Sequence, residues 1–385
     1  MGPPPAPECR TIRGQPSWML RSSSVGMAVT HLGGHMAPVF FDAESSAPVQ
    51  PYAISPWQGE TEDLPACGSE LPLRGDFFCL PFGSGPAPNG ETHPPHGLTS
   101  SGPWTHLESS SIGGTHRLKL CIELPVRNGR VTQTYTLHDG ENAVYTTTAI
   151  EGFAGPATMG HHAVLAVSAV ERALLVSTSP IILGMTCPYL FTNPAEGNYQ
   201  SLATGRRFTR LSRVPSIFRE ARFADCSAFP VRPGFTDLLQ VAQRPRGRHP
   251  AWTAAVNSEA GYLWFALKDP AVLPSTVLWI ENRGRHSAPW KGRTSLLGLE
   301  DVCSYFDTGI SASAAPNAFS LKGVPTAHRL SDKSPFEVRY IQGIVRTPAG
   351  FGRVKSVRFR PGEAVFIDAT GNRLSTRVRH EFLAA

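Results

Sequence analysis

The chain has 385 residues, of which 41% are hydrophobic and 17% are charged, and this balance excludes an intrinsically disordered protein. Its net charge of +6 is modest for the length, and its arginines are spread along the sequence rather than gathered in one basic tail. A concentrated basic face is typical of nucleic-acid binders, so we expect no nucleic-acid partner. No stretch approaches the ~20 apolar residues of a membrane helix, and we expect no membrane partner either.

The cysteine content predicts a reducing environment. The seven cysteines are odd in number and form no Cys-x-x-Cys pair; they are Cys9, Cys67, Cys79, Cys121, Cys187, Cys226 and Cys303. Buried free thiols are the simplest interpretation of such a set. Because the N-terminal residues also lack the apolar segment of a secretory signal, we expect a cytoplasmic protein.

The chain divides into a short tail and one long unit. Residues 1–17 are polar and rich in proline, which predicts a flexible tail. No internal repeat or low-complexity linker divides the remainder, so we expect a single domain over residues 18–385. Residues 61–105 are dense in Gly, Pro, Ser and His, and we interpret them as loops around a site.

Strand signals dominate from residue 115 onward. In 116–125 every second residue is apolar, and this period of two predicts a half-buried strand. The turn signal Asn128-Gly129 follows, and strands are predicted over 131–137 and 143–150. These segments together predict an antiparallel meander.

The second half of the chain continues this pattern. Two continuous apolar runs, 261–268 and 276–281, predict strands that are buried on both faces. Four further short strands are predicted over 337–346, 354–360, 364–368 and 373–379, and only 299–306 has a pattern that fits a couple of helical turns. The fold class is therefore predicted to be all-β, as a large antiparallel β-sandwich.

Four segments in a fixed order carry a resemblance to a known family. They are 73–83 (LRGDFFCLPFG) with His96-Gly97 and Trp104, then Met159-Gly160-His161-His162, then 278–290 (LWIENRGRHSAPW), and finally Leu297-Gly298-Leu299-Glu300. The set resembles the aldose 1-epimerase, or galactose mutarotase-like, superfamily. The resemblance implies the supersandwich form of the β-sandwich, a small-molecule carbohydrate partner, and isomerisation of sugar anomers without a cofactor or metal.

The resemblance also implies roles for individual residues. Glu300 is the candidate base and His161 the candidate acid, because interconversion of anomers needs proton transfer at two oxygens. Asp301 is an equal candidate on chemistry alone. As consecutive residues of a strand, His161 and His162 face opposite sides of the sheet, so only one of them can reach a groove. The resemblance favours His161, and a carboxylate at a helix N-terminus is the structural alternative for Glu300.

Six further residues are candidate sugar-binding groups. The His and Arg residues would donate hydrogen bonds and the indoles would stack on a pyranose face; the set is His96, Arg74, His162, Trp104, Arg285 and Trp290. Family members place an Asn-Arg pair after the Pro-rich segment, where this chain has Leu80-Pro81-Phe82-Gly83, and Arg74 is the upstream candidate to replace it. This departure leaves a non-catalytic carbohydrate-binding protein as the alternative function.

Two other groupings have alternative interpretations. The arginines between residues 206 and 222 fit either a site for carboxylate or phosphate groups or a solvated edge. The residues His96, one of His161 and His162, and Glu300 would also suit a two-histidine, one-carboxylate iron site, although no His-x-His spacing accompanies them.

Overall fold

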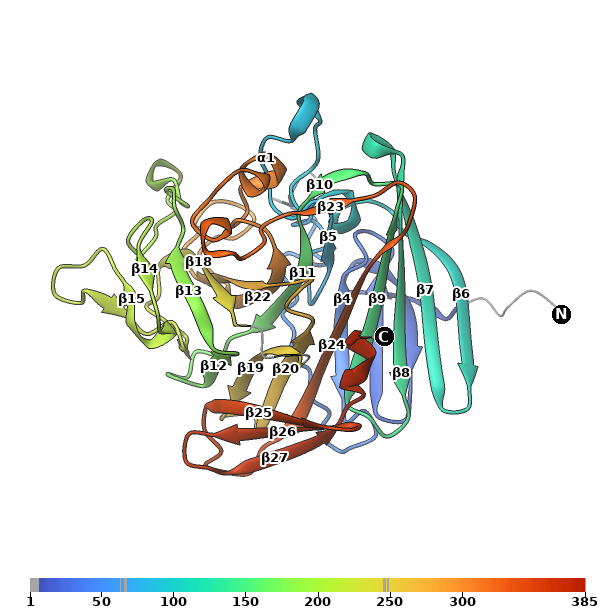
Figure 1. Cartoon of the computed structure of the whole chain (residues 1–385). Helices are drawn as coiled ribbons and strands as arrows, with labels where there is room; N and C mark the ends of the chain where they lie inside the picture. Colours follow the sequence, from blue (N-terminus) through green and yellow to red (C-terminus); the bar gives the residue numbers. More distant parts are fainter. Residues whose placement is uncertain (1–6, 63, 66–67, 245–246, 248, 385) are drawn as a thin grey trace.

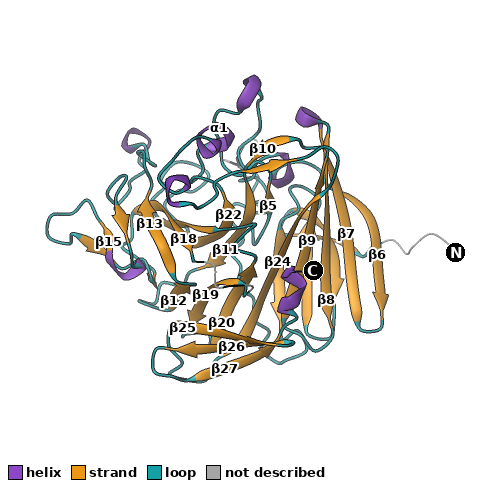
Figure 2. Cartoon of the chain, in the orientation of Figure 1, coloured by secondary structure: helices purple, strands orange, loops and turns teal. Residues whose placement is uncertain are grey.

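The structure, a computed structural model, describes residues 7–62, 64–65, 68–244, 247 and 249–384. Strands are the main regular secondary structure of this part of the chain, and Figure 2 shows how few and short the helices are. Two large antiparallel sheets form the body, and smaller sheets lie around them (Figure 1). The predicted fold class, an all-β antiparallel sandwich, is confirmed.

The first large sheet has seven strands and carries the candidate site. Their spatial order is β14 (Arg207–Phe208), β13 (Ile181–Thr186), β18 (Phe235–Gln243), β21 (Ser275–Asn282), β22 (Ser295–Cys303), β11 (Met159–Ala166) and β5 (Phe78–Cys79). Its central strands come from distant parts of the sequence, because β11 pairs with β22 and β22 pairs with β21.

The second large sheet has nine strands. Their order is β17 (Ala228–Phe229), β12 (Leu174–Thr178), β19 (Ala251–Asn257), β20 (Tyr262–Lys268), β24 (Phe336–Arg346), β9 (Ala143–Glu151), β8 (Gly129–His138), β7 (Thr115–Leu124) and β6 (Thr105–Ile112). The run from β7 to β9 is the meander predicted from the alternating apolar residues and the Asn-Gly turn, and β6 adds a strand at its edge that was not predicted.

The remaining elements are small. A four-stranded sheet comprises β1 (Cys9–Ile12), β2 (Gln15–Arg21), β3 (Val25–Thr30) and β4 (Met36–Phe41), and a three-stranded sheet comprises β25 (Val354–Arg360), β26 (Glu363–Asp368) and β27 (Arg373–Arg377). The strand pairs are β10 (Gly155–Ala157) with β23 (His328–Leu330), and β15 (Val214–Pro215) with β16 (Phe223–Ala224). The α-helix α1 (Gly309–Ala314) is accompanied by 3-10 turns at Pro88–Gly90, Leu98–Ser100, Pro125–Arg127, Pro194–Glu196, Leu211–Arg213, Ser320–Lys322 and His380–Ala384. None of the described helices is long and apolar enough to cross a membrane.

The main core lies between the two large sheets. Leu297 and Leu299 of β22 pack there with Ala163 of β11, and Trp264 and Tyr340 of the nine-stranded sheet belong to the same cluster. Because side chains alternate along a strand, the intervening residues of β22 and β11 point to the other face of the seven-stranded sheet. That second face is covered by segments 57–82 and 303–324, whose aromatic side chains form a separate buried cluster.

Two sequence-based expectations need correction. The segment 1–17, expected to be a flexible tail, contains β1 from Cys9 and the start of β2 at Gln15, while residues 1–6 lie outside the described part. The segment 299–306, expected to form helical turns, instead continues β22 through Cys303. Its residues are buried on both faces, and such a short apolar run has no periodicity that distinguishes a strand from a helix.

Candidate functional site

Glu300 and His162 form the centre of the candidate site. They are directly opposite each other on the paired strands β22 and β11, so both side chains leave the same face of the sheet. The Nε2 atom of His162 lies 3.2 Å from the Oε1 atom of Glu300. Both side chains are almost fully buried, yet both line a cavity of about 250 Å³.

Gly298 makes room for the carboxylate of Glu300. The two residues are two positions apart on β22 and therefore share a face. A Cβ atom at position 298 would lie 2.6 Å from Oε1 of Glu300 and 3.1 Å from Cβ of Trp279. The Gly-x-Glu spacing noted in the sequence thus has a steric reason.

Burial acts in opposite directions on the two members of this pair. Loss of hydration raises the pKa of the Glu300 carboxyl well above its ordinary value. Burial lowers the pKa of His162 well below its ordinary value, and the neighbouring His96 lowers it further. Both shifts favour the uncharged forms, in which the carboxyl holds one proton and the imidazole is neutral.

Aromatic rings hold the imidazole of His162 in place. Phe77 stacks on it with ring centroids 4.5 Å apart, and Trp279 packs edge-on at 5.8 Å. Nδ1 of His162 and Nε1 of Trp279 are buried without a hydrogen-bond partner in the described structure. Buried polar atoms are seldom left unpaired, so these two atoms retain unused hydrogen-bonding capacity beside the cavity.

His96 approaches the pair from the loop region 61–105. Its ring centroid lies 5.1 Å from that of His162, and its Nδ1 is 3.7 Å from the thiol of Cys79. Burial lowers the pKa of His96 to about 4, and the positive charge of Arg285 acts in the same direction. His96 is therefore a neutral imidazole at physiological pH, with one nitrogen to donate and one to accept a hydrogen bond.

Arg285 forms another wall of the cavity. Its guanidinium carbon lies 5.2 Å from the ring centroid of Trp279 and 4.9 Å from that of Trp290. Its nitrogens lie 3.3 Å from Glu70 Oε1 and 3.7 Å from Glu281 Oε2. These carboxylates offset its charge, so Arg285 presents oriented N–H donors rather than a free cation.

Asp307 is a second carboxyl group in the cavity. It follows the end of β22, and its main chain packs against Gly83, where a Cβ atom would lie 2.6 Å from the Asp307 carbonyl. The hydroxyl of Tyr189 donates a hydrogen bond to its carboxylate. Burial raises the pKa of Asp307 to about 6, so this group changes charge close to neutrality.

The structure places His161 away from the cavity. It points into the core between the sheets, where its Nδ1 lies 2.8 Å from Oδ2 of Asp76 and its ring stacks on Tyr340 at 4.2 Å. The expected opposition of His161 and His162 holds, but His162 is the one at the cavity. Asp301 is likewise on the core side, held by Lys268 and Tyr340.

Three other candidate binding residues also lie elsewhere. Arg74 is buried and donates hydrogen bonds to the carbonyls of Ile12 and Arg13, which is a structural role. Burial lowers the pKa of its guanidinium to about 10. Trp104 packs in the main core and donates from Nε1 to the Thr99 carbonyl at 2.8 Å. Trp290 is buried behind Arg285, against Trp57 and Trp279, and does not line the cavity.

The structure thus brings together His96, His162, Arg285 and Glu300 from the predicted set. Sequence reasoning missed Glu70, Phe77 and Asp307, and Trp279, within the predicted buried strand 276–281, also lines the cavity. Glu70 and Phe77 lie within the loop region that was expected to surround a site, but nothing in the sequence singled them out. Among the described residues, no group of three or more His, Cys, Asp or Glu side chains is arranged to hold a metal ion.

Comparison with solved structures identifies the architecture. A galactose mutarotase-like protein from Clostridium acetobutylicum superimposes with a TM-score of 0.58 at 11% identity, over 88% of this chain and 98% of its own. A galactose mutarotase related enzyme from Lactobacillus acidophilus gives a TM-score of 0.54 at 10% identity, over 86% of this chain and 98% of its own. This chain has the galactose mutarotase-like fold. Galactose 1-epimerase from Lactobacillus acidophilus NCFM is a further match, with a TM-score of 0.51 at 11% identity, over 87% of this chain and 95% of its own.

The sequence resemblance is therefore confirmed at the level of the fold. No family model matches the chain, and no curated protein matches it in sequence. At identities of 10–11% the structural likeness concerns the arrangement of strands, so the chemistry must be argued from the side chains of this chain.

Proposed function

We propose that the protein is an aldose 1-epimerase-like isomerase that interconverts the anomers of a free sugar in this cavity. The observation that carries the proposal is the Glu300–His162 pair, 3.2 Å apart and open to a cavity of about 250 Å³. At about 30 Å³ per water molecule, this volume holds roughly eight waters, which suits one monosaccharide rather than a chain. A small concave site with convergent polar groups is the usual form of a ligand-binding site.

The pair is suited to moving two protons together. In the favoured form, the Glu300 carboxyl gives its proton to the ring oxygen while Nε2 of His162 accepts the proton of the anomeric hydroxyl. The bond between C1 and the ring oxygen breaks, and the open aldehyde rotates about C1–C2. Ring closure on the other face returns both protons by the reverse path, so the pair ends as it began.

This assignment reverses the roles predicted from the sequence, in which the glutamate was the base. The raised pKa of Glu300 and the lowered pKa of His162 favour the carboxyl as the initial acid. The reaction is reversible, so each group also performs the opposite transfer in the other half of the cycle. The chemistry needs no cofactor.

Other cavity residues would hold the sugar. His96 and Arg285 offer hydrogen bonds to hydroxyl groups, and Trp279 presents an indole to the apolar face of a pyranose.

Six of the cysteines are free thiols in the described structure, which supports the further proposal of a cytoplasmic location.

Three single variants test the catalytic pair. Glu300→Gln and His162→Gln should each slow interconversion of anomers by about 10²–10⁴-fold, because each removes one proton-transfer group. His116→Gln is the matched control, since it makes the same change on β7 of the other large sheet, at a residue that does not line the cavity. Polarimetry on freshly dissolved sugars measures the rate per folded molecule. Equal rates in Glu300→Gln, His162→Gln and the wild type would refute the mechanism.

A non-catalytic carbohydrate-binding protein is the second candidate, and one observation favours it. Arg74, the candidate to replace the missing Asn-Arg pair, donates its hydrogen bonds to the carbonyls of Ile12, Arg13 and Pro72 and to Gln58. Sugar affinity in the wild type without acceleration of anomer interconversion would support this alternative and refute the isomerase.

A further inference from the structure

A cluster of exposed arginines occupies the edge of the molecule at β14 and the β15–β16 hairpin. We call it the arginine face; it comprises Arg206, Arg207, Arg210, Arg213, Arg219, Arg222 and Arg232. The only acidic residue between positions 204 and 224 is Glu220. No ion pair within the described residues involves any of the seven, so their charge is directed to solvent.

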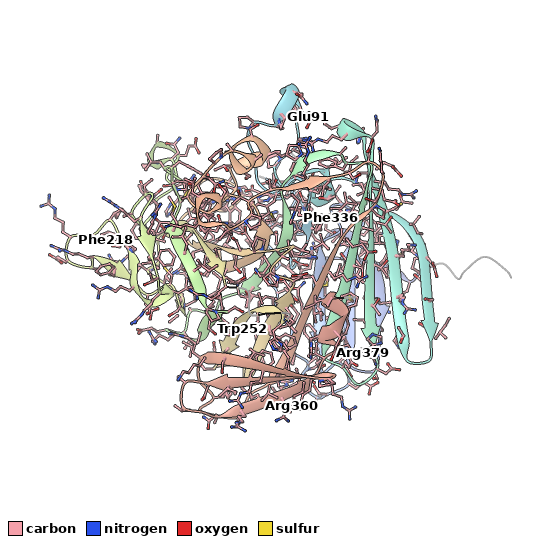
Figure 3. All side chains as sticks on the ribbon, viewed as in Figure 1. Glu91, Phe218, Trp252, Phe336, Arg360 and Arg379 are labelled. Carbon is pink, nitrogen blue, oxygen red and sulfur yellow. The ribbon has the colours of Figure 1, made fainter. Side chains whose placement is uncertain are left out.

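This face is built on an ordered platform. Leu211 and Val214 anchor it in the main core, and the strands β15 and β16 pair through Val214–Ala224 and Pro215–Phe223. Within the hairpin, the hydroxyl of Ser216 donates to the Ala221 carbonyl at 2.7 Å. Figure 1 shows β15 at the left edge of the view, and the Phe218 label in Figure 3 marks the same region.

Two of the guanidiniums lie over phenylalanine rings. The guanidinium carbon of Arg213 lies 4.0 Å from the ring centroid of Phe223, and that of Arg232 lies 4.2 Å from the centroid of Phe218. The attraction between a guanidinium and a ring face restricts the side chain and uses none of its N–H donors for an ion pair. The N–H fork of a guanidinium forms paired hydrogen bonds with carboxylate, sulfate or phosphate oxygens.

In the first part of the arginine face, segment 204–213, the exposed residues between the arginines are hydroxylic or glycine. In segment 204–213 the apolar residues Phe208 and Leu211 are buried, and every exposed residue is Arg, Thr, Ser or Gly. The hydroxyl groups of Thr209 and Ser212 thus alternate with guanidiniums along the surface. A surface of this composition hydrogen-bonds both oxyanions and neutral hydroxyl groups.

We propose that the arginine face binds an acidic polysaccharide, a chain that carries carboxylate or sulfate groups among sugar hydroxyls. Its seven uncompensated guanidiniums match the anionic groups, and the interspersed Thr and Ser hydroxyls match the sugar. Single-stranded nucleic acid is a poorer fit, because it needs open aromatic faces for its bases and guanidiniums cover one face of both Phe218 and Phe223. Segment 204–213 exposes no apolar side chain for insertion into a bilayer. The hairpin exposes Ile217 and Phe223, and Arg213 lies over the ring of Phe223, so the apolar area is small beside the seven guanidiniums. The inference concerns a surface outside the cavity and does not depend on the isomerase.

A pair of triple variants tests the proposal with the net charge held equal. Arg207→Gln, Arg210→Gln and Arg222→Gln together remove three charges from the arginine face. Arg358→Gln, Arg373→Gln and Arg377→Gln remove three exposed charges from the β25–β27 sheet, which lies apart from the hairpin, as the Arg360 and Phe218 labels in Figure 3 show. The probes are heparin and polygalacturonate, with dextran as the neutral control, at an ionic strength of about 0.15 M.

We expect the wild type to bind at least one acidic polysaccharide and not dextran. The first triple variant should bind it about ten-fold more weakly, because three exposed guanidinium–oxyanion contacts are lost. The β25–β27 variant should bind as the wild type does, and the rate of anomer interconversion should be unchanged in both.

Three results would overturn the proposal. The first is equal weakening of polysaccharide binding in the two triple variants, which would show that the net charge alone determines the affinity. The second is tighter binding of duplex DNA, or of vesicles containing phosphatidylserine, than of either polysaccharide. The third is absence of binding to both acidic polysaccharides.

Discussion

Asp307 is the cavity carboxyl whose ionisation falls nearest to neutral pH. Burial raises its pKa from 3.8 to about 6, so it is a carboxylate above that pH and a neutral acid below it. A carboxylate accepts hydrogen bonds from sugar hydroxyls more strongly than a neutral acid does. The affinity of the cavity for sugar should therefore be full above about pH 6 and fall as the pH is lowered through it.

The corresponding prediction concerns KM as a function of pH. Between about pH 8 and pH 5 we expect KM of the wild type to rise about ten-fold, as a charged hydrogen bond is lost. Asp307→Asn should have the high KM throughout, because its amide does not titrate. In Tyr189→Phe the loss of the hydroxyl donor should move the step to higher pH. Persistence of the wild-type step in Asp307→Asn would assign it to another group.

At the scale of single strands, β22 must bring a carboxylate to the cavity between bulky neighbours. Gly298 is the residue that makes this possible, since a Cβ atom there would lie 2.6 Å from Oε1 of Glu300. Displacement of a catalytic group by about 1 Å can reduce a rate by up to about 10²-fold.

We therefore expect Gly298→Ala to slow anomer interconversion by at least about ten-fold, with a stability loss of about 1–3 kcal/mol from overpacking. Rates by polarimetry and stability by urea unfolding separate the two effects. Gly26→Ala on β3 is the control, because a Cβ atom at that glycine meets nothing within 4 Å. A normal rate in Gly298→Ala would contradict the steric role of the glycine.

The strands show how far a sequence can be interpreted without a structure. The meander was predicted within one to two residues at its ends, for instance 116–125 against the observed β7 at Thr115–Leu124, because alternating apolar residues mark a half-buried strand. In β11 both faces are buried, with Val164 on one side and Ala163 and Leu165 on the other. Its apolar pattern therefore does not identify which face meets the cavity, and the choice of His161 over His162 was wrong for this reason.

The convergence of the site was predictable only in part. His96, Arg285 and Glu300 were named from motif order, and all three line the cavity. Asp307 could not be identified, because its proximity depends on the main chain folding back against Gly83, more than two hundred positions earlier. Contacts of this kind depend on tertiary packing and leave no periodic signal in the sequence.

At the scale of the whole molecule, a buried polar network joins the two large sheets behind the site. Nζ of Lys268 on β20 lies 2.5 Å from Asp301 of β22, and the hydroxyl of Tyr340 on β24 donates to the same carboxylate at 2.8 Å. Gln342 of β24 donates to Asp76 at 2.8 Å, and Asp76 also binds His161. His161 and Asp301 are the cross-strand partners next to His162 and Glu300, so the network fixes the strands that carry the catalytic pair.

Removal of one charge from this network should be costly. We expect Lys268→Met to lower the free energy of unfolding by about 3–5 kcal/mol, because it leaves the buried Asp301 carboxylate without its cation. The double variant Lys268→Met with Asp301→Leu should recover much of this loss. Urea unfolding measures both, with the exposed Lys355→Met as the control. A double variant as unstable as the single one would show that the lost packing, and not the unpaired charge, is responsible.

The central claim is that two buried neighbours on adjacent strands exchange protons with an anomeric centre. It is tested most directly by two-dimensional NMR exchange between the α and β anomeric protons of a panel of aldoses at equilibrium. The account predicts faster exchange of at least one aldose with the wild-type protein, and the uncatalysed rate with Glu300→Gln combined with His162→Gln. Exchange at the uncatalysed rate for every aldose with the wild type, or equal acceleration by the double variant, would contradict it.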